Sequence, residues 1–228
     1  MSPWTAAMLS AIGAVVPLAV AAALSSVPIL AMIALLLSEK GRSSAPFYLV
    51  GWIVGLFGVA GLFALGLSTV SRPSSPTDFP VFGALEIIIG IALLVFGVVL
   101  IVRQADTRSG SSWAARLAGI SPVSAAGLGV ALNLRPKAVL LAAAAGLAIG
   151  TKSLSVSEGM MALAVYTAIG GSSVAIPVLA SLVRPDAMEP RLRQVLGWLE
   201  RNQHIVAGVV VLLVGALITG NGFTHLAG

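Results

Sequence analysis

The chain has no cysteine and few charged residues. Without cysteine, disulfide bonds and thiolate metal sites are excluded, and the redox compartment cannot be read from the sequence. Charged residues make up only 9% of the 228 residues, while hydrophobic residues make up 58% and the mean hydropathy is +1.04. Because soluble domains carry about 25% charged residues, this composition predicts an integral membrane protein that crosses the bilayer several times.

Catalytic and nucleotide-binding motifs are also missing. The patterns Gly-Lys-Ser/Thr, His-Glu-x-x-His and Gly-x-Ser-x-Gly do not occur, and no metal-ligand pairs stand at a recognisable spacing. The formal charge of +5 comes from cations in short loops, not from one basic face, so it does not indicate a nucleic-acid partner. We therefore expect no enzyme activity, no catalytic residue, no cofactor, no metal and no nucleic acid; the expected partner is the lipid bilayer.

Six apolar windows approach the length of about 20 residues that a transmembrane helix needs. They cover roughly residues 17–37, 47–67, 81–102, 125–149, 160–182 and 205–218. Apolar residues 4–15 precede the first window and make that run too long for one straight crossing, so we expect this lead-in to be interfacial or re-entrant. Residues 113–120 mirror it before the fourth window.

A further helix is expected between the fifth and sixth windows. The apolar side chains there fall at i, i+3, i+4 and i+7, while charged side chains point elsewhere: Leu192, Val195, Leu196 and Leu199. This spacing predicts an amphipathic helix that lies on the membrane surface.

Basic residues are distributed unevenly between the connections. The first, third and fifth connections contain Lys40, Arg42, Arg103, Arg108, Arg116, Arg184, Arg191, Arg193 and Arg201, whereas the other two contain only Arg72 and Lys152. By the positive-inside rule the basic connections are cytoplasmic, so both termini are expected outside a plasma (inner) membrane. No cation precedes the first apolar run, so we expect that run to stay on the chain and not to be a cleaved signal peptide.

The pattern Ala-Leu-polar-x-x-Pro occurs twice, at residues 23–28 and 131–136, which are 108 residues apart. With three windows in each half, the second half enters the membrane from the opposite side. The sequence therefore predicts one all-α membrane domain over residues 1–228, with six transmembrane helices in two inverted three-helix repeats, residues 1–103 and 104–228. This architecture is typical of secondary transporters.

The two prolines of this pattern predict broken helices in the first and fourth windows, since proline removes a backbone donor and clashes with the preceding turn. Unwound backbone and half-helix ends at such breaks hold polar substrate groups or coupling ions in transporters. The candidate substrate-binding residues are Ser25, Ser26, Pro28, Asn133, Arg135, Pro136 and Lys137. The alternative is a pair of plain proline kinks.

Three charged residues have two interpretations each. Arg135 and Lys137 bind an anionic group such as phosphate, sulfate or carboxylate, or they snorkel to the cytoplasmic interface as ordinary helix-end cations. Glu86 is the one acidic residue well inside a window; it carries a coupling proton or pairs with a base, or it sits at the outer interface.

The spacings Gly51-x-x-x-Gly55 and Gly146-x-x-x-Gly150 predict close helix packing within the chain, or in a homodimer.

Several segments carry a family resemblance: Ser26-Val27-Pro28, Ser38-Glu39-Lys40-Gly41-Arg42, Gly51-Trp52-Ile53-Val54-Gly55, and Leu132-Asn133-Leu134-Arg135-Pro136-Lys137-Ala138 followed by the apolar stretch at 140–146. With them the chain resembles the glycolipid-addressing (Gap/Sap, sulfolipid-addressing) family of the lysine-exporter (LysE-type) transporter superfamily. The resemblance implies export or flipping of an amphipathic envelope glycolipid, or its precursor, across the inner membrane.

The chain departs from the superfamily pattern in both halves. The Pro-Gly-Pro of the first half is Ser26-Val27-Pro28 here, and the Asn-Pro-Lys of the second half is stretched over residues 133–137. Two alternatives therefore stay open: a LysE-type exporter of amino acids or other small solutes, and a non-transporting scaffold subunit of a lipid synthesis or export complex.

Overall fold

The computed structural model describes residues 3–38, 41–68, 79–102, 117, 119–150 and 154–227. Its elements are α1 (Pro3–Ala23), α2 (Ser26–Leu37), the 3₁₀ helix η1 (Arg42–Ser44), α3 (Ala45–Ser68), α4 (Phe79–Val102), α6 (Pro122–Leu132), α7 (Pro136–Gly150), α8 (Val156–Val183) and α9 (Pro185–Ala227). Since no strand occurs in this described part, the predicted all-α class is confirmed.

The chain divides into two compact units. Unit 1 contains Met1–Thr69 and Thr107–Arg201, and unit 2 contains Val70–Asp106 and Asn202–Gly228. The boundary inside α9 falls at Asn202, whose φ of −117° and ψ of 16° interrupt the helix. Each unit takes segments from both halves of the sequence, and the two three-helix repeats stay a prediction.

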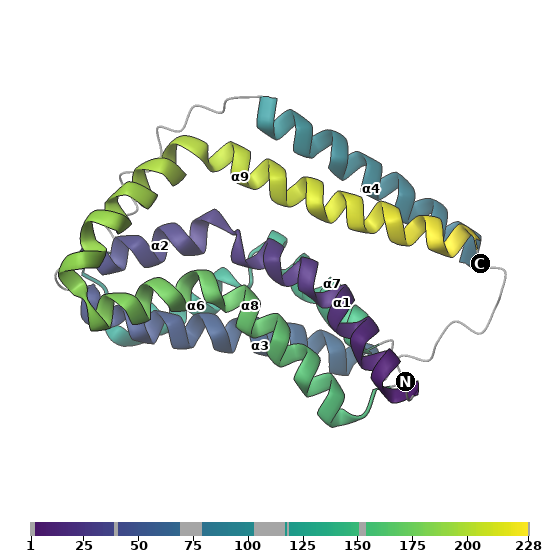
Figure 1. Cartoon of the computed structure of the whole chain (residues 1–228), viewed down its shortest axis with the longest axis horizontal. Helices are drawn as coiled ribbons and strands as arrows, with labels where there is room; N and C mark the ends of the chain where they lie inside the picture. The colour runs from purple at the N-terminus through teal and green to yellow at the C-terminus, as the bar shows by residue number, and fades with distance from the viewer. Residues whose placement is uncertain are drawn as a thin grey trace. The chain divides into compact units, whose positions relative to one another are not determined.

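Two continuous helical segments of the described chain are long and apolar enough to cross a membrane, Arg42–Gly66 and Val156–Val183. Two bent pairs pass the same test if each pair counts as one span: Met8–Ala23 with Ser26–Leu37, bent by 49°, and α6 with α7, bent by 65°. Figure 1 shows α1 and α2 meeting at their bend. The structure thus has two to four candidate spans, with shorter apolar segments in α4 and α9, and the predicted six spans stay a prediction.

The lead-in to the first window belongs to α1. Residues 4–15 continue without interruption to Ala23, and Pro17 lies inside this helix. The break therefore comes seven residues or so after Pro17, at Leu24 and Ser25, where α2 has not yet begun. The corresponding residues before the fourth window lie mostly outside the described part of the chain.

Helix α3 packs against α6 and α7 through glycine. A Cβ atom added to Gly129 would lie 2.5 Å from the Tyr48 carbonyl oxygen, and one added to Gly150 would lie 2.6 Å from the Ala64 carbonyl oxygen. Gly51 is in similar contact with the backbone of α6. No side chain fits at these positions, so both predicted glycine spacings are confirmed as packing faces within the chain.

The two bent pairs run in opposite directions along α3. Gly55, Ala60 and Ala64 of α3 meet Asn133, Gly146 and Gly150 in the same order, so α6 and α7 run parallel to α3. Helices α1 and α2 run antiparallel to it, because Gly170 of α8 lies between Ala22 and Leu56 whereas the Tyr48 hydroxyl reaches Pro28. An inverted repeat requires this opposition of the two pairs.

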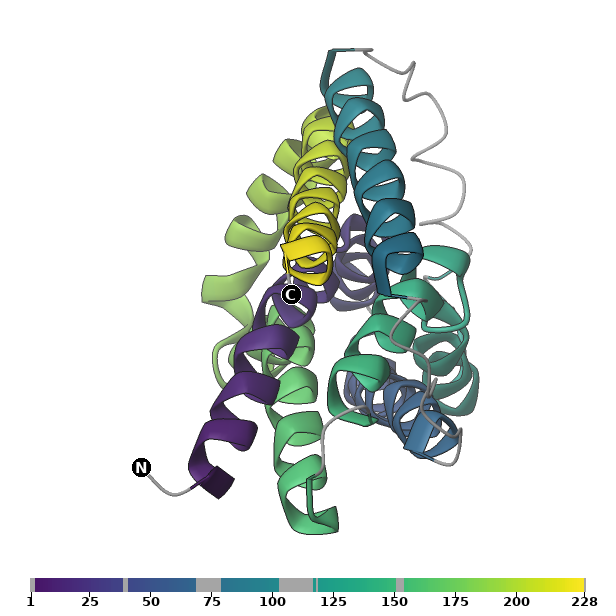
Figure 2. The same cartoon turned by 90° about the vertical axis from the view of Figure 1, so that its right-hand side faces the viewer.

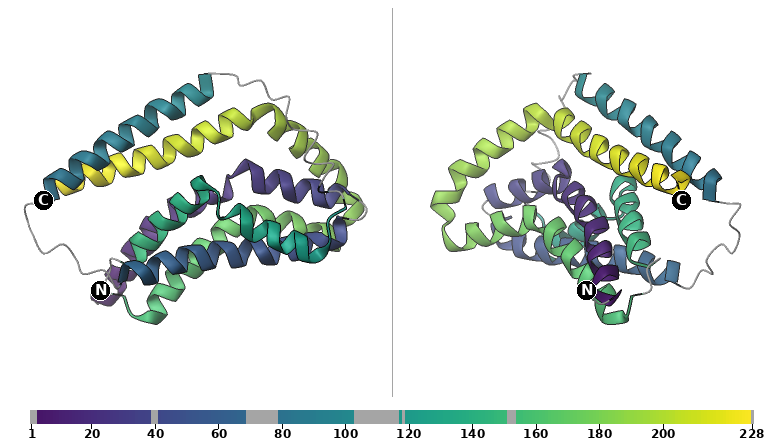
Figure 3. Two further views of the ribbon diagram at one scale, coloured as in Figure 1. Left: turned by 180° about the vertical axis from the view of Figure 1, so that it is seen from behind. Right: turned by 45° about the vertical axis from the view of Figure 1, so that its right-hand side comes forward.

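Unit 2 is an antiparallel pair, α4 with the last part of α9, which lie side by side in Figures 2 and 3. A Cβ atom on Gly97 would lie 2.8 Å from Leu212 Cγ and 3.0 Å from the Gly208 carbonyl oxygen, and Gly90 meets Thr219 in the same way. Small residues again allow this close approach.

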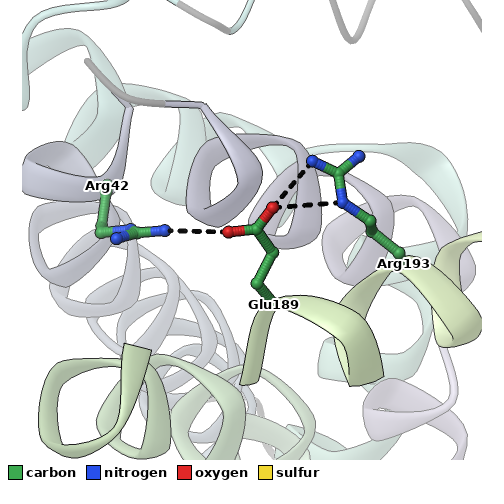
Figure 4. A network of polar contacts seen from close by, with 3 residues as sticks. All are labelled: Arg42, Glu189 and Arg193. Atoms are coloured by element: carbon green, nitrogen blue, oxygen red, sulfur yellow. Dashed lines mark hydrogen bonds and ion pairs between the residues drawn. The ribbon is translucent and has the colours of Figure 1, made fainter. Parts of the chain in front are cut away.

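The first part of α9 is the predicted amphipathic helix, but its apolar face is only partly as expected. Leu192 and Leu199 are buried, whereas Val195 is exposed. Glu189 ties this helix to the segment before α3: it accepts hydrogen bonds from Arg193 Nε (3.3 Å) and Nη2 (2.9 Å) and lies 3.8 Å from Arg42 Nη2 (Figure 4). Exposed ion pairs of this kind stabilise a fold by about 0–1 kcal/mol.

Candidate functional site

The first break separates α1 from α2 at Leu24 and Ser25. The last turn of α1 is a tighter, 3₁₀-type turn, because the Ser25 N–H donates to the Ala22 carbonyl oxygen, three residues back, at 3.1 Å. Ser25 is the N-cap of α2, with extended φ and ψ of −68° and 111°, but its side chain makes no capping hydrogen bond. The hydroxyl groups of Ser25 and Ser26 have no hydrogen-bond partner in the described part of the chain, and both residues are half-buried.

The second break separates α6 from α7 and is fastened by Asn133. The N–H groups of Asn133 and Leu134 donate to carbonyls three residues back, both at 3.0 Å, so the Gly129 carbonyl oxygen loses its usual helical donor. Asn133 Nδ2 supplies the replacement at 3.0 Å and also donates to the Trp52 carbonyl oxygen of α3 at 3.3 Å. Only 2% of Asn133 is exposed, so its side-chain amide stabilises the break from inside the protein.

Both prolines lie just after their breaks. Pro28 is the third residue of α2 and is buried, and Pro136 is the first residue of α7 and is exposed. N–H groups of a first helical turn lack helical partners, so proline is tolerated there. The predicted breaks are present, and each proline begins a new half-helix after the bend.

The two cations of the second break are exposed. Arg135 lies in the turn and Lys137 is the second residue of α7, and neither has an ion-pair partner in the described part of the chain. The Arg135 backbone is held by α7, because the Val139 N–H donates to the Arg135 carbonyl oxygen at 2.9 Å. Their side chains are therefore available to a ligand or to lipid head groups.

Both breaks lie at one level of α3, marked by Trp52. Asn133 of the second break bonds to the Trp52 carbonyl oxygen. On the other side, Tyr48 Oη donates to the Pro28 carbonyl oxygen at 2.9 Å, and Ala22 lies at the level of Leu56. In sequence, Ser25 lies between Ala22 and Pro28 just as Trp52 lies between Leu56 and Tyr48, so the first break is at about the level of Trp52 along α3.

The Trp52 side chain is the functional candidate that sequence reasoning missed. Its ring is 2% exposed, and its Nε1 is a buried polar atom without a hydrogen-bond partner in the described part of the chain. The only sequence signal is an indole inside an apolar window, between the two glycines of a packing face. That signal does not separate a packed ring from a binding ring.

Glu86 lies in α4 of unit 2, and its side chain falls outside the described residues. Its predicted roles in proton coupling or charge pairing stay predictions. Within the described residues, no group of three histidine, aspartate or glutamate side chains is placed to hold a metal ion.

The assembled features favour a polar or anionic oxygen as ligand. The N-terminus of α2 offers N–H groups without helical partners and two hydroxyl groups that make no hydrogen bond within the described residues, and a helix N-terminus carries partial positive charge. The second break adds Arg135 and Lys137, which no carboxylate of the described residues neutralises. Such donors bind sulfate, phosphate or carboxylate groups by charge-assisted hydrogen bonds.

The family model described as Sap, sulfolipid-1-addressing protein, matches residues 15–224. The chain belongs to this family. The match includes both breaks, all of α3 and most of α9, so the sulfolipid-addressing part of the resemblance is confirmed. Placement of this Sap-family chain in the LysE-type superfamily stays a prediction. No curated protein and no solved structure matches it.

Proposed function

We propose that this protein exports or flips an anionic, amphipathic envelope glycolipid, or its precursor, across the plasma membrane, and that it does so without enzyme chemistry. The observation that carries the proposal is that two oppositely running, broken helix pairs have their breaks at about the same level along α3, near Trp52. The family's description, sulfolipid-1-addressing, supports a sulfated lipid as the cargo.

The head group binds between the breaks. A sulfate oxygen accepts hydrogen bonds from the first turn of α2 and from the Ser25 and Ser26 hydroxyl groups, while Arg135 and Lys137 neutralise its charge. Asn133 fixes the backbone around this site, and Pro28 and Pro136 keep the half-helices separate. The acyl chains stay among the lipids, so the site needs to enclose only the head group.

The depth of the site fits loading from the inner leaflet. Trp52 is seven residues into α3, about 10 Å along a helix of 24 residues, so the breaks are nearer to Arg42 than to Ser68. By the charge rule the Arg42 end is cytoplasmic and both termini are outside. Opposed repeats would then expose the site alternately to the two sides, and Glu86 is the proposed proton carrier for that cycle.

The test neutralises both cations by Arg135→Gln and Lys137→Met in a strain that lacks the native gene. The expected result is a lipid that is made normally but is missing from cell-surface extracts, with protein level unchanged. The matched control exchanges the same residues as Arg135→Lys and Lys137→Arg. This control retains the charges, so it keeps most surface lipid while losing some affinity through the changed hydrogen-bond geometry.

Orientation is measured on the same variants. The chain contains no cysteine, so single cysteines at positions 40, 75 and 193 report on which side each connection lies. An impermeant external reagent should label position 75 alone. Normal surface lipid from a correctly oriented double neutral variant would contradict the proposed site, and a deletion strain that shows only hypersensitivity to amino-acid analogues would indicate a small-solute exporter. Normal surface lipid after loss of every polar break residue would indicate a scaffold.

A further inference from the structure

We propose that the Trp52 indole N–H is a substrate-binding donor, which hydrogen-bonds an anionic oxygen of the lipid head group between the two helix breaks. This inference rests on the proposed function and adds to it a binding residue that carries no charge. Three observations support it: the unpaired state of the N–H, its position, and its chemistry.

The N–H is buried and unpaired. Trp52 is 2% exposed, and Nε1 has no acceptor in the described part of the chain. Buried polar groups in native proteins are nearly always hydrogen-bonded, and leaving one unpaired is unfavourable. An acceptor supplied by a ligand removes this deficit, so the unpaired N–H is a reason to expect a ligand oxygen beside it.

From helix geometry we infer that the Trp52 side chain points towards the first turn of α2. Tyr48 and Trp52 are four residues apart and share one face of α3, and helical side chains lean towards the N-terminus of their helix. Because the Tyr48 hydroxyl bonds to the Pro28 carbonyl oxygen at 2.9 Å, the neighbouring ring of Trp52 is directed at the turn in which α2 begins. Its N–H therefore joins the unpaired N–H groups at that helix end.

Two other buried polar atoms in the described residues lack partners, Tyr166 Oη and Ser181 Oγ, and both are on α8. Tyr166 follows Leu163, which lies beside Gly61, so it sits about two turns of α3 away from Trp52. Hydroxyl groups also donate or accept as required, whereas an indole N–H only donates. Trp52 is thus the member of the three that lies at the breaks and selects an acceptor.

The experiment observes the indole directly. The full-length chain, labelled with ¹⁵N-tryptophan, is placed in detergent micelles, where its four tryptophans give four indole N–H signals. Trp52→Phe identifies the signal of Trp52 by its loss. The probe is sulfatide, a galactosylceramide that carries one sulfate, and the matched neutral probe is galactosylceramide itself.

The expected result is a shift of the Trp52 signal on titration with sulfatide and no shift with galactosylceramide. Trp52→Phe should weaken sulfatide binding about tenfold, the usual loss for one hydrogen bond to a charged group. Trp198→Phe makes the same exchange at an exposed tryptophan of α9 and should leave the affinity unchanged.

Two outcomes overturn the inference and are distinguishable. If sulfatide binds in preference to galactosylceramide but the Trp52 signal does not move, the proposed function stands and the role of Trp52 is wrong. If the wild-type chain shows no preference for sulfatide, the sulfated-lipid function fails together with it. The titration of the wild-type chain decides between these outcomes, and Trp4→Phe, Trp113→Phe and Trp198→Phe assign the Trp52 signal by elimination, so the test survives even where Trp52→Phe does not fold.

Discussion

The two helix breaks of unit 1 begin with the same sequence pattern but are held in different ways. At the second break, Asn133 fills the vacated carbonyl of Gly129 and crosses to α3. At the first break the corresponding residue is Ser25, whose side chain bonds to nothing in the described chain; the hydroxyl of Tyr48 holds Pro28 from outside instead. A shared pattern therefore fixes where the helices break but not which groups stay available.

This difference assigns separate tasks to the two breaks. The second is closed internally and bent by 65°, so it provides fixed geometry and presents its cations outwards. The first is bent by 49° and keeps its hydroxyl and N–H groups unpaired, so it provides the hydrogen-bond donors. Substitutions at the two breaks should accordingly separate stability from transport.

The largest effect is expected from Asn133→Asp. The substitution keeps the shape but places a buried carboxylate against two carbonyl oxygens, and an uncompensated buried charge costs about 3–5 kcal/mol of unfolding free energy. Titration with dodecyl sulfate of the purified protein in mild detergent measures this loss. Ser25→Asp is the matched control, because a carboxylate at an N-cap is favourable and should cost nothing. Equal losses at the two positions would show that the breaks are held alike.

A smaller loss is expected from Gly129→Ala, which tests the contact that seats the second break on α3. Its Cβ atom would lie 2.5 Å from one α3 backbone atom and 2.6 Å from another, and such overpacking costs about 1–3 kcal/mol. Gly127→Ala, two residues earlier in α6, meets nothing within 4 Å and should gain up to about 1 kcal/mol of helix stability. The same denaturation series measures both, and a stable Gly129→Ala protein would contradict the packing described.

The sequence located both breaks because a polar residue and a proline interrupt apolar runs at equivalent places. The pattern alone does not tell a mid-helix kink from the first turn of a new helix, and the structure places both prolines in a first turn, while their role in substrate binding stays a prediction. The sequence also grouped Asn133 with the ligand-binding residues, which stays a prediction, and it did not predict that the Asn133 Nδ2 donates to two backbone carbonyl oxygens. Hydrogen bonds of this kind depend on which helices pack against each other, which a local sequence pattern does not give.

Trp52 likewise could not be recognised as a candidate binding residue from the sequence alone. The Trp52 ring is one apolar group among many until α2, α6, α7 and α8 pack against α3 and bury it, and its N–H then has no hydrogen-bond partner in the described residues. The candidate spans were also clearer than the repeats, because apolar length is a local property whereas pairing between halves is not. Periodicity likewise predicted the amphipathic part of α9 but not that Leu192 and Leu199 would be covered by protein.

Tyr48→Phe tests the single external contact at the first break. It removes the hydroxyl that donates to the Pro28 carbonyl oxygen, and one such hydrogen bond contributes about 0.5–1.5 kcal/mol. Tyr166→Phe is the matched control: Tyr166 is equally buried, but its hydroxyl has no partner among the described residues, so the change should be neutral or stabilising. Equal destabilisation by the two substitutions would mean that the Tyr48 hydroxyl does not hold the break.

The smallest effect on stability is expected from Ser25→Ala combined with Ser26→Ala. Neither hydroxyl makes a hydrogen bond within the described chain, so the unfolding free energy should change by less than about 0.5 kcal/mol. Surface lipid should nevertheless fall, because these hydroxyl groups donate to the head group in the proposed site. Retained activity in this stable double variant would show that these hydroxyl groups are not the donors of the site, and would leave the helix N–H groups and Trp52 as its donors. A large loss of stability would instead show that Ser25 caps α2 in the membrane and that the two breaks are fastened from within in the same manner.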